Sequence, residues 1–223
     1  MEHVPYANAI GSVMYAMIST RLDLSFAISL LRRFMSNPGT EHWCALRWVL
    51  RYINSTSHVG LEYCKMGKSL DLVGFVDSDF AGDRDTRKST TSYFFTLGRN
   101  CVSFKSQLQP IVALSSTKAE YVVVADVFRK ALWLQGILSE MQLLDELVTI
   151  YSDSQSAIHL SKNPIYHERT KDMDVQFHFV KELIAQEVIN LKKVAIEDNL
   201  ADDGTKVVMA TKFKHCLNLL FVK

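Results

Sequence analysis

Cysteine is scarce in this sequence of 223 residues, and its four cysteines stand far apart. None belongs to a CxxC pair or lies near histidines at zinc-finger spacing, so the sequence indicates neither a zinc site nor a disulfide framework. The chain also lacks a run of ~18 apolar residues, which a membrane-spanning helix needs, and its first residues carry no cationic leader. We therefore expect an intracellular protein, cytoplasmic or nuclear and not secreted, with no membrane partner.

An excess of charge of either sign is also missing, because 25 basic residues stand against 24 acidic ones and the formal net charge is +1. This balance argues against a protein that holds nucleic acid by its overall charge, although a local basic groove is compatible with it. With 48% hydrophobic and 22% charged residues, the chain has the composition of a globular protein. Its length suffices for one large or two small domains.

The first part of the chain has the apolar spacing of helices. Three helical segments are expected, at 7–18, 23–35 and 41–53. A short strand at 60–63 follows, and residues 65–68 then form a hinge or boundary. We predict a small helical unit over residues 1–66.

The second part begins with strands. Three of them in succession predict an antiparallel meander, at 70–76, 92–97 and 101–106. Helices and strands then alternate before a terminal helix, at 116–138, 148–152, 154–160, 170–186 and 188–196. This order predicts an α/β unit over residues 67–223, with a five-stranded mixed sheet flanked by helices. Its first strand is expected to be antiparallel to the meander strands and parallel to the later ones.

Four acidic residues stand where they could hold metal ions. Glu120 is the clearest, because it lies on the apolar stripe of its helix, where an unpaired charge costs several kcal/mol. Asp77 and Asp153 follow the carboxyl ends of two strands, where open sheets form their crevice, and Asp202 opens a late helix. Carboxylates that converge there suit two magnesium ions about 3.5 to 4 Å apart, as phosphodiester cleavage requires.

The three aspartates also have ordinary structural interpretations. Asp77 fits a turn at the end of a strand, Asp153 fits the N-cap of the next helix, and Asp202 fits a loop or cap. The metal-binding hypothesis therefore depends on the set of four rather than on one position.

Long motifs throughout the chain are those of a known family: Gly74 to Asp83 (GFVDSDFAGD), Lys88 to Tyr93, Ala113 to Tyr121, Tyr151 to Ile158, Arg169 to Lys171, and Asn199 to Asp202 with Thr205-Lys206. They resemble the ribonuclease H domain of copia-type LTR retrotransposon Pol polyproteins. The residues before them resemble the C-terminal end of the same polyprotein's reverse transcriptase, its thumb and connection.

The resemblance implies that Asp77, Glu120, Asp153 and Asp202 bind Mg²⁺, for which Mn²⁺ can substitute. It also implies hydrolysis of the RNA strand of an RNA–DNA hybrid, selected by groove shape and the 2′-hydroxyl. The same motifs supply candidate substrate contacts: Ser116, Thr117, Ser154, Gln155, Arg169 and Lys171. A second implied partner is the palm and fingers of the parent reverse transcriptase, whose paired aspartates this chain lacks, so DNA synthesis is not expected from it.

The chain departs from the family pattern at positions that include 92, 203 and 204. Ser92 stands where the family prefers glycine, and Asp203-Gly204 replaces an apolar pair. Gly204 is expected to weaken the last helix by about 1 kcal/mol relative to alanine. Because sequences drift in this way once selection ends, the alternative function is that of a catalytically inactive retrotransposon remnant that binds nucleic acid or protein.

Overall fold

The computed structural model describes residues 4–64, 70–143, 147–162 and 174–223. The first part of the chain is helical, with α1 (Tyr6–Ser19), η1 (Leu22–Leu24), α2 (Ser25–Leu31), η2 (Arg32–Phe34) and α3 (Thr40–Ser55). The three predicted helical segments are confirmed, although two short 3-10 helices flank α2. The predicted hinge at 65–68 and the unit boundary after residue 66 lie outside the described residues.

The second part is built on five strands: β1 (Leu72–Ser78), β2 (Thr90–Leu97), β3 (Asn100–Leu108), β4 (Val148–Ser152) and β5 (Ile189–Lys193). Their order in the sheet is β3-β2-β1-β4-β5. β1 is antiparallel to β2 and parallel to β4, and β5 is parallel to β4. The predicted five-stranded mixed sheet is therefore confirmed, including the directions of its strands.

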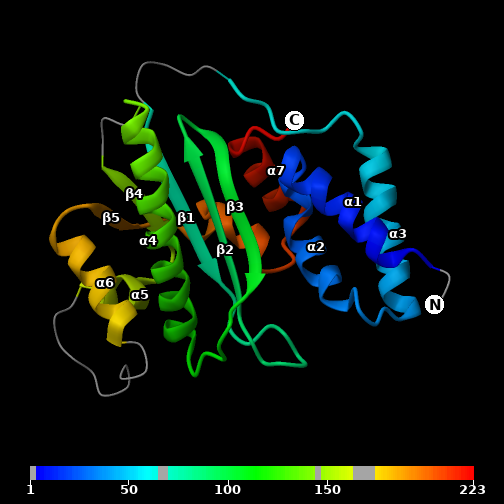
Figure 1. Cartoon of the computed structure of the whole chain (residues 1–223), viewed down its shortest axis with the longest axis horizontal. Coiled ribbons are helices and arrows are strands. Elements are labelled where there is room, and N and C mark those ends of the chain that lie inside the picture. Colours follow the sequence, from blue (N-terminus) through cyan, green and yellow to red (C-terminus); the bar gives the residue numbers. More distant parts are fainter. Residues whose placement is uncertain (1–3, 65–69, 144–146, 163–173) are drawn as a thin grey trace.

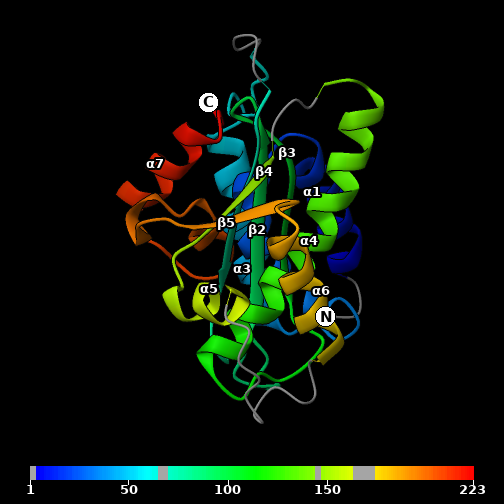
Figure 2. The same cartoon turned by 90° about the vertical axis from the view of Figure 1, so that its left-hand side faces the viewer.

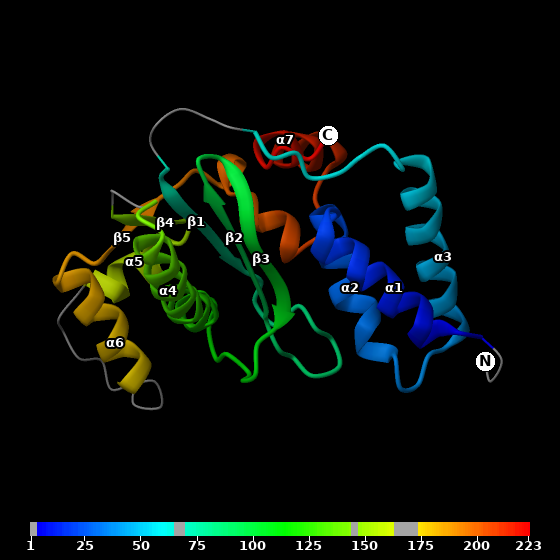
Figure 3. The same ribbon diagram turned by 45° about the horizontal axis from the view of Figure 1, so that its top comes forward.

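Helices cover both faces of this sheet, as Figures 1 and 3 show. On one face lie α4 (Ser116–Glu140), α5 (Gln155–Lys162) and α6 (Asp174–Ala185). Figure 2 views the sheet from its β5 edge, with α4 to one side of it and α7 to the other. On the other face lie the 3-10 helix η5 (Leu200–Gly204), α7 (Ala210–Leu219) and the helical first part of the chain. Another short 3-10 helix, η4 (Ile196–Asp198), links β5 to η5.

The side chains of β2 point alternately to the two faces of the sheet and contribute to two separate cores. Successive side chains of a strand point to opposite faces, so Phe95 packs with the α4 side of the sheet while Phe94 packs with η5 and α7. The α4 core contains the helix's apolar stripe, including Val123, Val127 and Ala131. Because β2 is covered on both faces, nearly every one of its residues is buried.

The helical first part has its own apolar cluster, made by Tyr6, Ile10, Val13, Leu24, Ile28, Leu31 and Leu46. Polar contacts join it to the rest of the chain. Arg33 forms an ion pair with Asp83 at 2.8 Å, and the Ser106 hydroxyl donates to Ser29 Oγ at 3.0 Å. The division into units at residue 66 stays a prediction.

Two expectations from the sequence are wrong. The segment 60–63 is no strand of the sheet: Leu61 forms one isolated antiparallel bridge with Val222, because Gly60 and Lys223 exchange backbone hydrogen bonds at the end of the chain. Asp202 does not open an α-helix but lies inside η5, and α7 begins only at Ala210. In the described part of the chain, no helix combines the length and apolar character needed to cross a bilayer.

Candidate metal site

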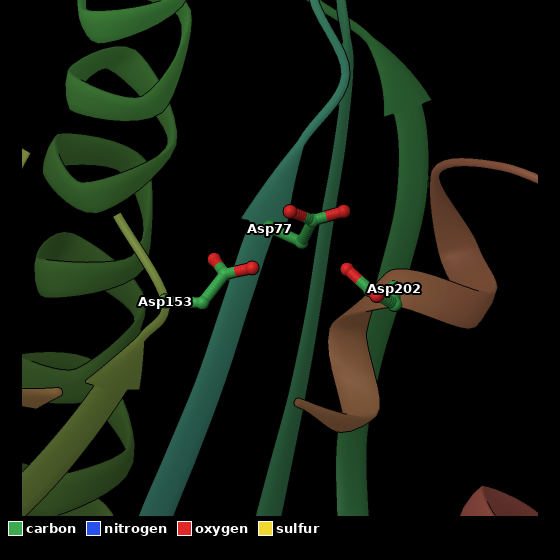
Figure 4. A group of neighbouring side chains, drawn as sticks. All are labelled: Asp77, Asp153 and Asp202. Atoms are coloured by element: carbon green, nitrogen blue, oxygen red, sulfur yellow. The ribbon is translucent and has the colours of Figure 1, made fainter. Parts of the chain in front are cut away.

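Three aspartate side chains meet where β1 and β4 end. One carboxylate oxygen from each of Asp77, Asp153 and Asp202 lies within 4.8 Å of the others, and Figure 4 shows the three carboxyl groups beside one another. The register of the sheet explains the first two. Val76 pairs with Ser152 in the parallel ladder, so Asp77 and Asp153 each follow one residue later.

Asn199 holds η5, and with it the third aspartate, against β1. Its Nδ2 donates to the carbonyl oxygen of Val76 at 2.9 Å, and its Oδ1 accepts the backbone N–H of Ala201 at 3.2 Å. The side chain is completely buried. Because one amide caps η5 and also binds β1 one residue before Asp77, it brings Asp202 to Asp77.

Asp77 is buried, and the Thr205 hydroxyl donates to its Oδ2. Burial raises the pKa of Asp77 to about 7, and the negative charges of Asp202 and Asp153 add to this effect, while Thr205 and Lys206 oppose it. The site thus disfavours the ionised form of this carboxyl group. A bound cation would reverse that preference.

Two lysines accompany Asp202. Lys212 contacts its Oδ2 and also donates to the carbonyl oxygen of Ile196 at 2.7 Å. The Lys206 ammonium lies 2.8 Å from the other oxygen, Oδ1, and 3.8 Å from Oδ2 of Asp77. Burial alone would raise the pKa of Asp202, but the two lysines outweigh it and the pKa is lowered.

Glu120 lies next to the three aspartates but outside their group. It belongs to the start of α4, and the backbone N–H of Ser78 donates to it. Burial, followed by the charges of Asp77 and Asp153, raises the pKa of Glu120 to about 9. Its Oε2 is buried and has no hydrogen-bond partner among the described residues. The structure therefore brings three of the four predicted metal ligands together and places the fourth within their electrostatic reach.

The helix that follows Asp153 is capped by the next residue. Ser154 Oγ accepts the backbone N–H of Ala157 at 3.2 Å, which is the bond that an N-cap makes. The interpretation of Asp153 as the N-cap is therefore wrong. Burial, with the charge of Asp202, raises the pKa of its half-buried carboxyl group.

The predicted substrate contacts that the structure describes lie where α4 and α5 begin. Ser116 and Gln155 are exposed, and the Thr117 hydroxyl donates to Ser156 Oγ at 3.3 Å, which joins the two helix starts. N–H groups at helix N-termini favour anions such as phosphate, so this rim suits a nucleic-acid backbone. Ser154 belongs to the same rim as the cap of α5. Two further candidates lie outside the described residues: Arg169 and Lys171.

The sequence did not reveal the side chains that hold Asp202 and Asp77, which are Lys206, Lys212 and Thr205. Lys206 follows Asp202 by four residues, a spacing that is a usual signal for an ion pair. Lys212 gave no such signal, because its contact with Asp202 depends on where α7 packs. The hydrogen bond from Thr205 to Asp77 joins residues 128 positions apart and was equally hidden.

Gly204 closes η5 at the point where η5 packs on β2. A Cβ at this position would lie 2.8 Å from the Cβ of Ser92, closer than real contacts allow. The prediction that Gly204 weakens the last helix is wrong, because it lies before α7 and its lack of a side chain makes the packing possible. Two departures from the family pattern, Ser92 and Gly204, thus face each other.

Long matches with known proteins include two polyproteins. The retrovirus-related Pol polyprotein from transposon TNT 1-94 of Nicotiana tabacum is 44% identical over 220 residues, which are 99% of this chain and 16% of the relative. The corresponding polyprotein from transposon RE1 of Arabidopsis thaliana is 35% identical over 94% of this chain and 14% of the relative. The chain belongs to the retrovirus-related Pol polyproteins. The resemblance predicted from the motifs is confirmed, and this Pol chain spans only a small part of the length of these two polyproteins.

A third relative covers less of the Pol chain. Secreted RxLR effector protein 161 of Plasmopara viticola is 46% identical over 134 residues, which are 60% of this chain and 94% of the relative. No family model matches.

Solved structures resemble the Pol chain more remotely. A foamy viral protease-reverse transcriptase in complex with double-stranded DNA has a TM-score of 0.49 at 14% identity and covers 85% of this chain and 38% of the viral one. LC11-RNase H1 in complex with an RNA/DNA hybrid has a TM-score of 0.45 at 16% identity, over 60% of this chain and 94% of that protein. Likeness at this level carries no argument about activity, and the fold class rests on the sheet described above.

Proposed function

We propose that this Pol chain is a ribonuclease H, a divalent-metal-dependent endonuclease that hydrolyses the RNA strand of RNA–DNA hybrids. The observation that carries the proposal is the convergence of Asp77, Asp153 and Asp202, with oxygens within 4.8 Å of one another, at the carboxyl edge of the sheet. Glu120 stands beside them with one buried oxygen that no described group satisfies. Membership in the Pol polyprotein family supports the same reaction.

The donor set fits a magnesium ion. Mg²⁺ prefers carboxylate oxygens, and three or four of them converge here, two from nearly inaccessible side chains. The raised pKa values of Asp77 and Glu120 have the same origin, since burial raises both and the charges of neighbouring carboxylates add to it. Bound by these groups, magnesium supplies activation of a water molecule and stabilisation of the leaving oxygen.

The residues of the chain have distinct tasks in this proposal. Asp77, Glu120, Asp153 and Asp202 hold the metal. Thr205 fixes Asp77 by a hydrogen bond, and Lys212 fixes Asp202 against η4. The exposed starts of α4 and α5 hold the phosphates of the hybrid next to the metal, through N–H groups and hydroxyls that include those of Ser116 and Thr117.

A cleavage assay tests the proposal. Purified protein with Mg²⁺ and an RNA-labelled hybrid should yield RNA fragments that end in a 5′-phosphate. The substitution Asp77→Asn should reduce cleavage by at least about 100-fold, because it removes a charged ligand from the reacting centre. Double-stranded DNA of the same sequence should stay intact.

The matched control is Asp126→Asn. Asp126 lies on α4 like Glu120 but pairs with Lys105 at 2.7 Å on the surface, away from the site. This variant should cut hybrids at the wild-type rate. If the folded wild-type protein cuts no hybrid with either Mg²⁺ or Mn²⁺, the proposed activity is wrong.

A second candidate function is binding without catalysis, as expected of an inactive remnant. The neutralisation of Asp202 by both Lys206 and Lys212 favours it, because a carboxylate already paired twice has less to offer a metal. The extensive match to a relative named as an effector protein is also compatible with it. The distinguishing result is tight binding of hybrid with neither turnover nor stabilisation by metal, because a ligand that binds only the folded state must stabilise it.

A further inference from the structure

Lys206 occupies the place between two of the proposed metal ligands. Its ammonium lies 2.8 Å from Oδ1 of Asp202 and 3.8 Å from Oδ2 of Asp77. About half of the Lys206 side chain is exposed, so it is not packed in place.

Lys212 differs in each of these respects. It contacts the opposite oxygen of Asp202, donates a second hydrogen bond to the carbonyl oxygen of Ile196, and is 22% exposed against 48% for Lys206. Two fixed acceptors hold this ammonium at the back of Asp202. The two lysines are therefore unequal, and only Lys206 stands on the side of Asp202 that faces Asp77.

An alternative acceptor for Lys206 lies in the same region. Asp203 and Lys206 both line a cavity of about 330 Å³, whose other walls include Tyr52, Val208 and Phe213. Both carboxylate oxygens of Asp203 are buried, and the Cys216 thiol and the charges of Lys212 and Lys206 act on them. A negative charge in apolar surroundings attracts an ammonium that can reach it.

We propose that Lys206 is the resident cation of the metal-free site, and that a divalent ion displaces its ammonium from Asp202 and Asp77 toward Asp203. The proposal rests on the proposed function, because it assumes that these carboxylates bind a divalent ion. Lys206 then determines how tightly the ion binds, and Asp203 stabilises the displaced position.

The physical basis is competition for the same oxygens. A divalent ion and an ammonium cannot both lie against Asp202 Oδ1 and Asp77 Oδ2, since like charges a few Å apart near a protein surface repel strongly. Removing the ammonium therefore removes an opposing charge from the bound state. It also leaves the metal-free carboxylates without their countercharge.

Calorimetric titration with Mg²⁺ tests the proposal on the whole chain. The substitution Lys206→Met keeps the apolar stem and removes the charge, and it should lower the Kd for Mg²⁺ by at least about tenfold. The matched control Lys105→Met removes a lysine charge that pairs with Asp126 at 2.7 Å, away from the site, and it should leave the Kd unchanged. Lys212→Met should instead raise the Kd, because that lysine orients Asp202. Without metal, Lys206→Met should also melt at a lower temperature than the wild-type protein, and Mg²⁺ should raise its melting temperature by more.

Two further variants complete the test. Lys206→Arg keeps the charge and should keep a Kd near that of the wild type, which supports the proposal even where Lys206→Met folds poorly. Asp203→Asn removes the alternative acceptor and should weaken Mg²⁺ binding several-fold. An unchanged Kd in Asp203→Asn overturns the role of Asp203.

The failures are distinguishable. If the wild-type protein binds Mg²⁺ and Lys206→Met binds it equally or more weakly, the displacement of Lys206 is wrong while the proposed function stands. If the wild-type protein binds neither Mg²⁺ nor Mn²⁺, the proposed function fails, and the displacement fails with it.

Discussion

Carboxylates are buried in two regions of the molecule, and the two regions differ in how completely the protein pairs these charges. In the helical first part, Asp23 is completely buried, and Arg21 binds it through two nitrogens at 3.1 and 2.9 Å. The Tyr52 hydroxyl donates to it at 2.9 Å, and the same arginine also binds Thr56. Every charge in this cluster has its partner inside the protein.

At the carboxyl edge of the sheet, negative charge exceeds positive charge. Asp77 and Glu120 have pKa values raised to about 7 and about 9, mainly by burial and then by neighbouring carboxylates. Folding places these groups together at a cost that the surrounding protein does not offset. A compensated buried charge serves structure, whereas an uncompensated cluster is suited to an external cation, which is what the proposed function requires.

The largest effect on stability is expected when the compensated cluster around Asp23 is broken. Asp23→Asn leaves the Arg21 guanidinium, itself nearly inaccessible, without its counterion. We expect a loss of about 3 to 5 kcal/mol in the free energy of unfolding, measured by urea denaturation at pH 7. A loss below about 1 kcal/mol would mean that the cluster is not compensated in the way the contacts indicate.

The pH dependence of the metal-free protein should reveal the uncompensated cluster. The pKa of Asp77 rises from 3.8 to about 7 on folding and that of Glu120 from 4.5 to about 9, so the folded state binds more protons than the unfolded state between these values. Stability from these groups is complete below about pH 4 and is lost as the pH rises through 7 and then 9. In EDTA we expect a fall of at least about 3 kcal/mol between pH 5 and pH 8, because each pK unit between the unfolded and folded values corresponds to about 1.4 kcal/mol. Saturating Mg²⁺ should flatten the curve, and a metal-free curve that is flat or rising over this range contradicts the interpretation.

A smaller effect should follow from the packing that places Asp202. Gly204→Ala puts a Cβ 2.8 Å from that of Ser92, and we expect a loss of about 1 to 3 kcal/mol in thermal or urea unfolding. Adding Ser92→Gly should recover part of this loss, because it removes the group that clashes. Gly136→Ala is the control: it lies in α4 with open space around it and should stabilise the protein by about 0.5 to 1 kcal/mol. Equal effects at 204 and 136 would show that η5 does not pack tightly on β2.

The smallest expected effect concerns a partly exposed ion pair. Asp126 and Lys105 are 2.7 Å apart, and each side chain is 33% exposed. Asp126→Asn should therefore cost less than about 1 kcal/mol, and less still in high salt. A cost comparable to that of Asp23→Asn would mean that burial does not explain why the two ion pairs differ in their contribution to stability.

Much of the fold follows from local pattern. The strand at 148–152 and the long helix that carries Glu120 have the bounds the sequence predicts within two residues, because apolar spacing and turn residues act locally. The position of Asp77 beside Asp153 was also predictable, since parallel strands bring their carboxyl ends to one edge. Local pattern misled at 60–63, where an apolar alternation meets only the last residues of the chain.

The finer structure of the site depends on contacts that no local pattern encodes. Lys212 reaches Asp202 only because α7 packs behind η5, and Thr205 bonds a strand that lies far earlier in the chain. The clash that Gly204 avoids exists only because the Ser92 side chain points from β2 toward η5. Such contacts are products of tertiary packing, so a single sequence predicts the acidic set but not the groups that compensate or orient it.

The most direct measurement is the free energy of unfolding of wild-type protein and Asp77→Asn at pH 8, each with EDTA and with Mg²⁺. If Asp77 belongs to an uncompensated cation site, the variant should be at least as stable as the wild type without metal, and Mg²⁺ should stabilise the wild type far more. If Asp77→Asn instead loses about 3 kcal/mol or more without metal, as Asp23→Asn should, and Mg²⁺ stabilises neither protein, the carboxylates are structural and the account is wrong.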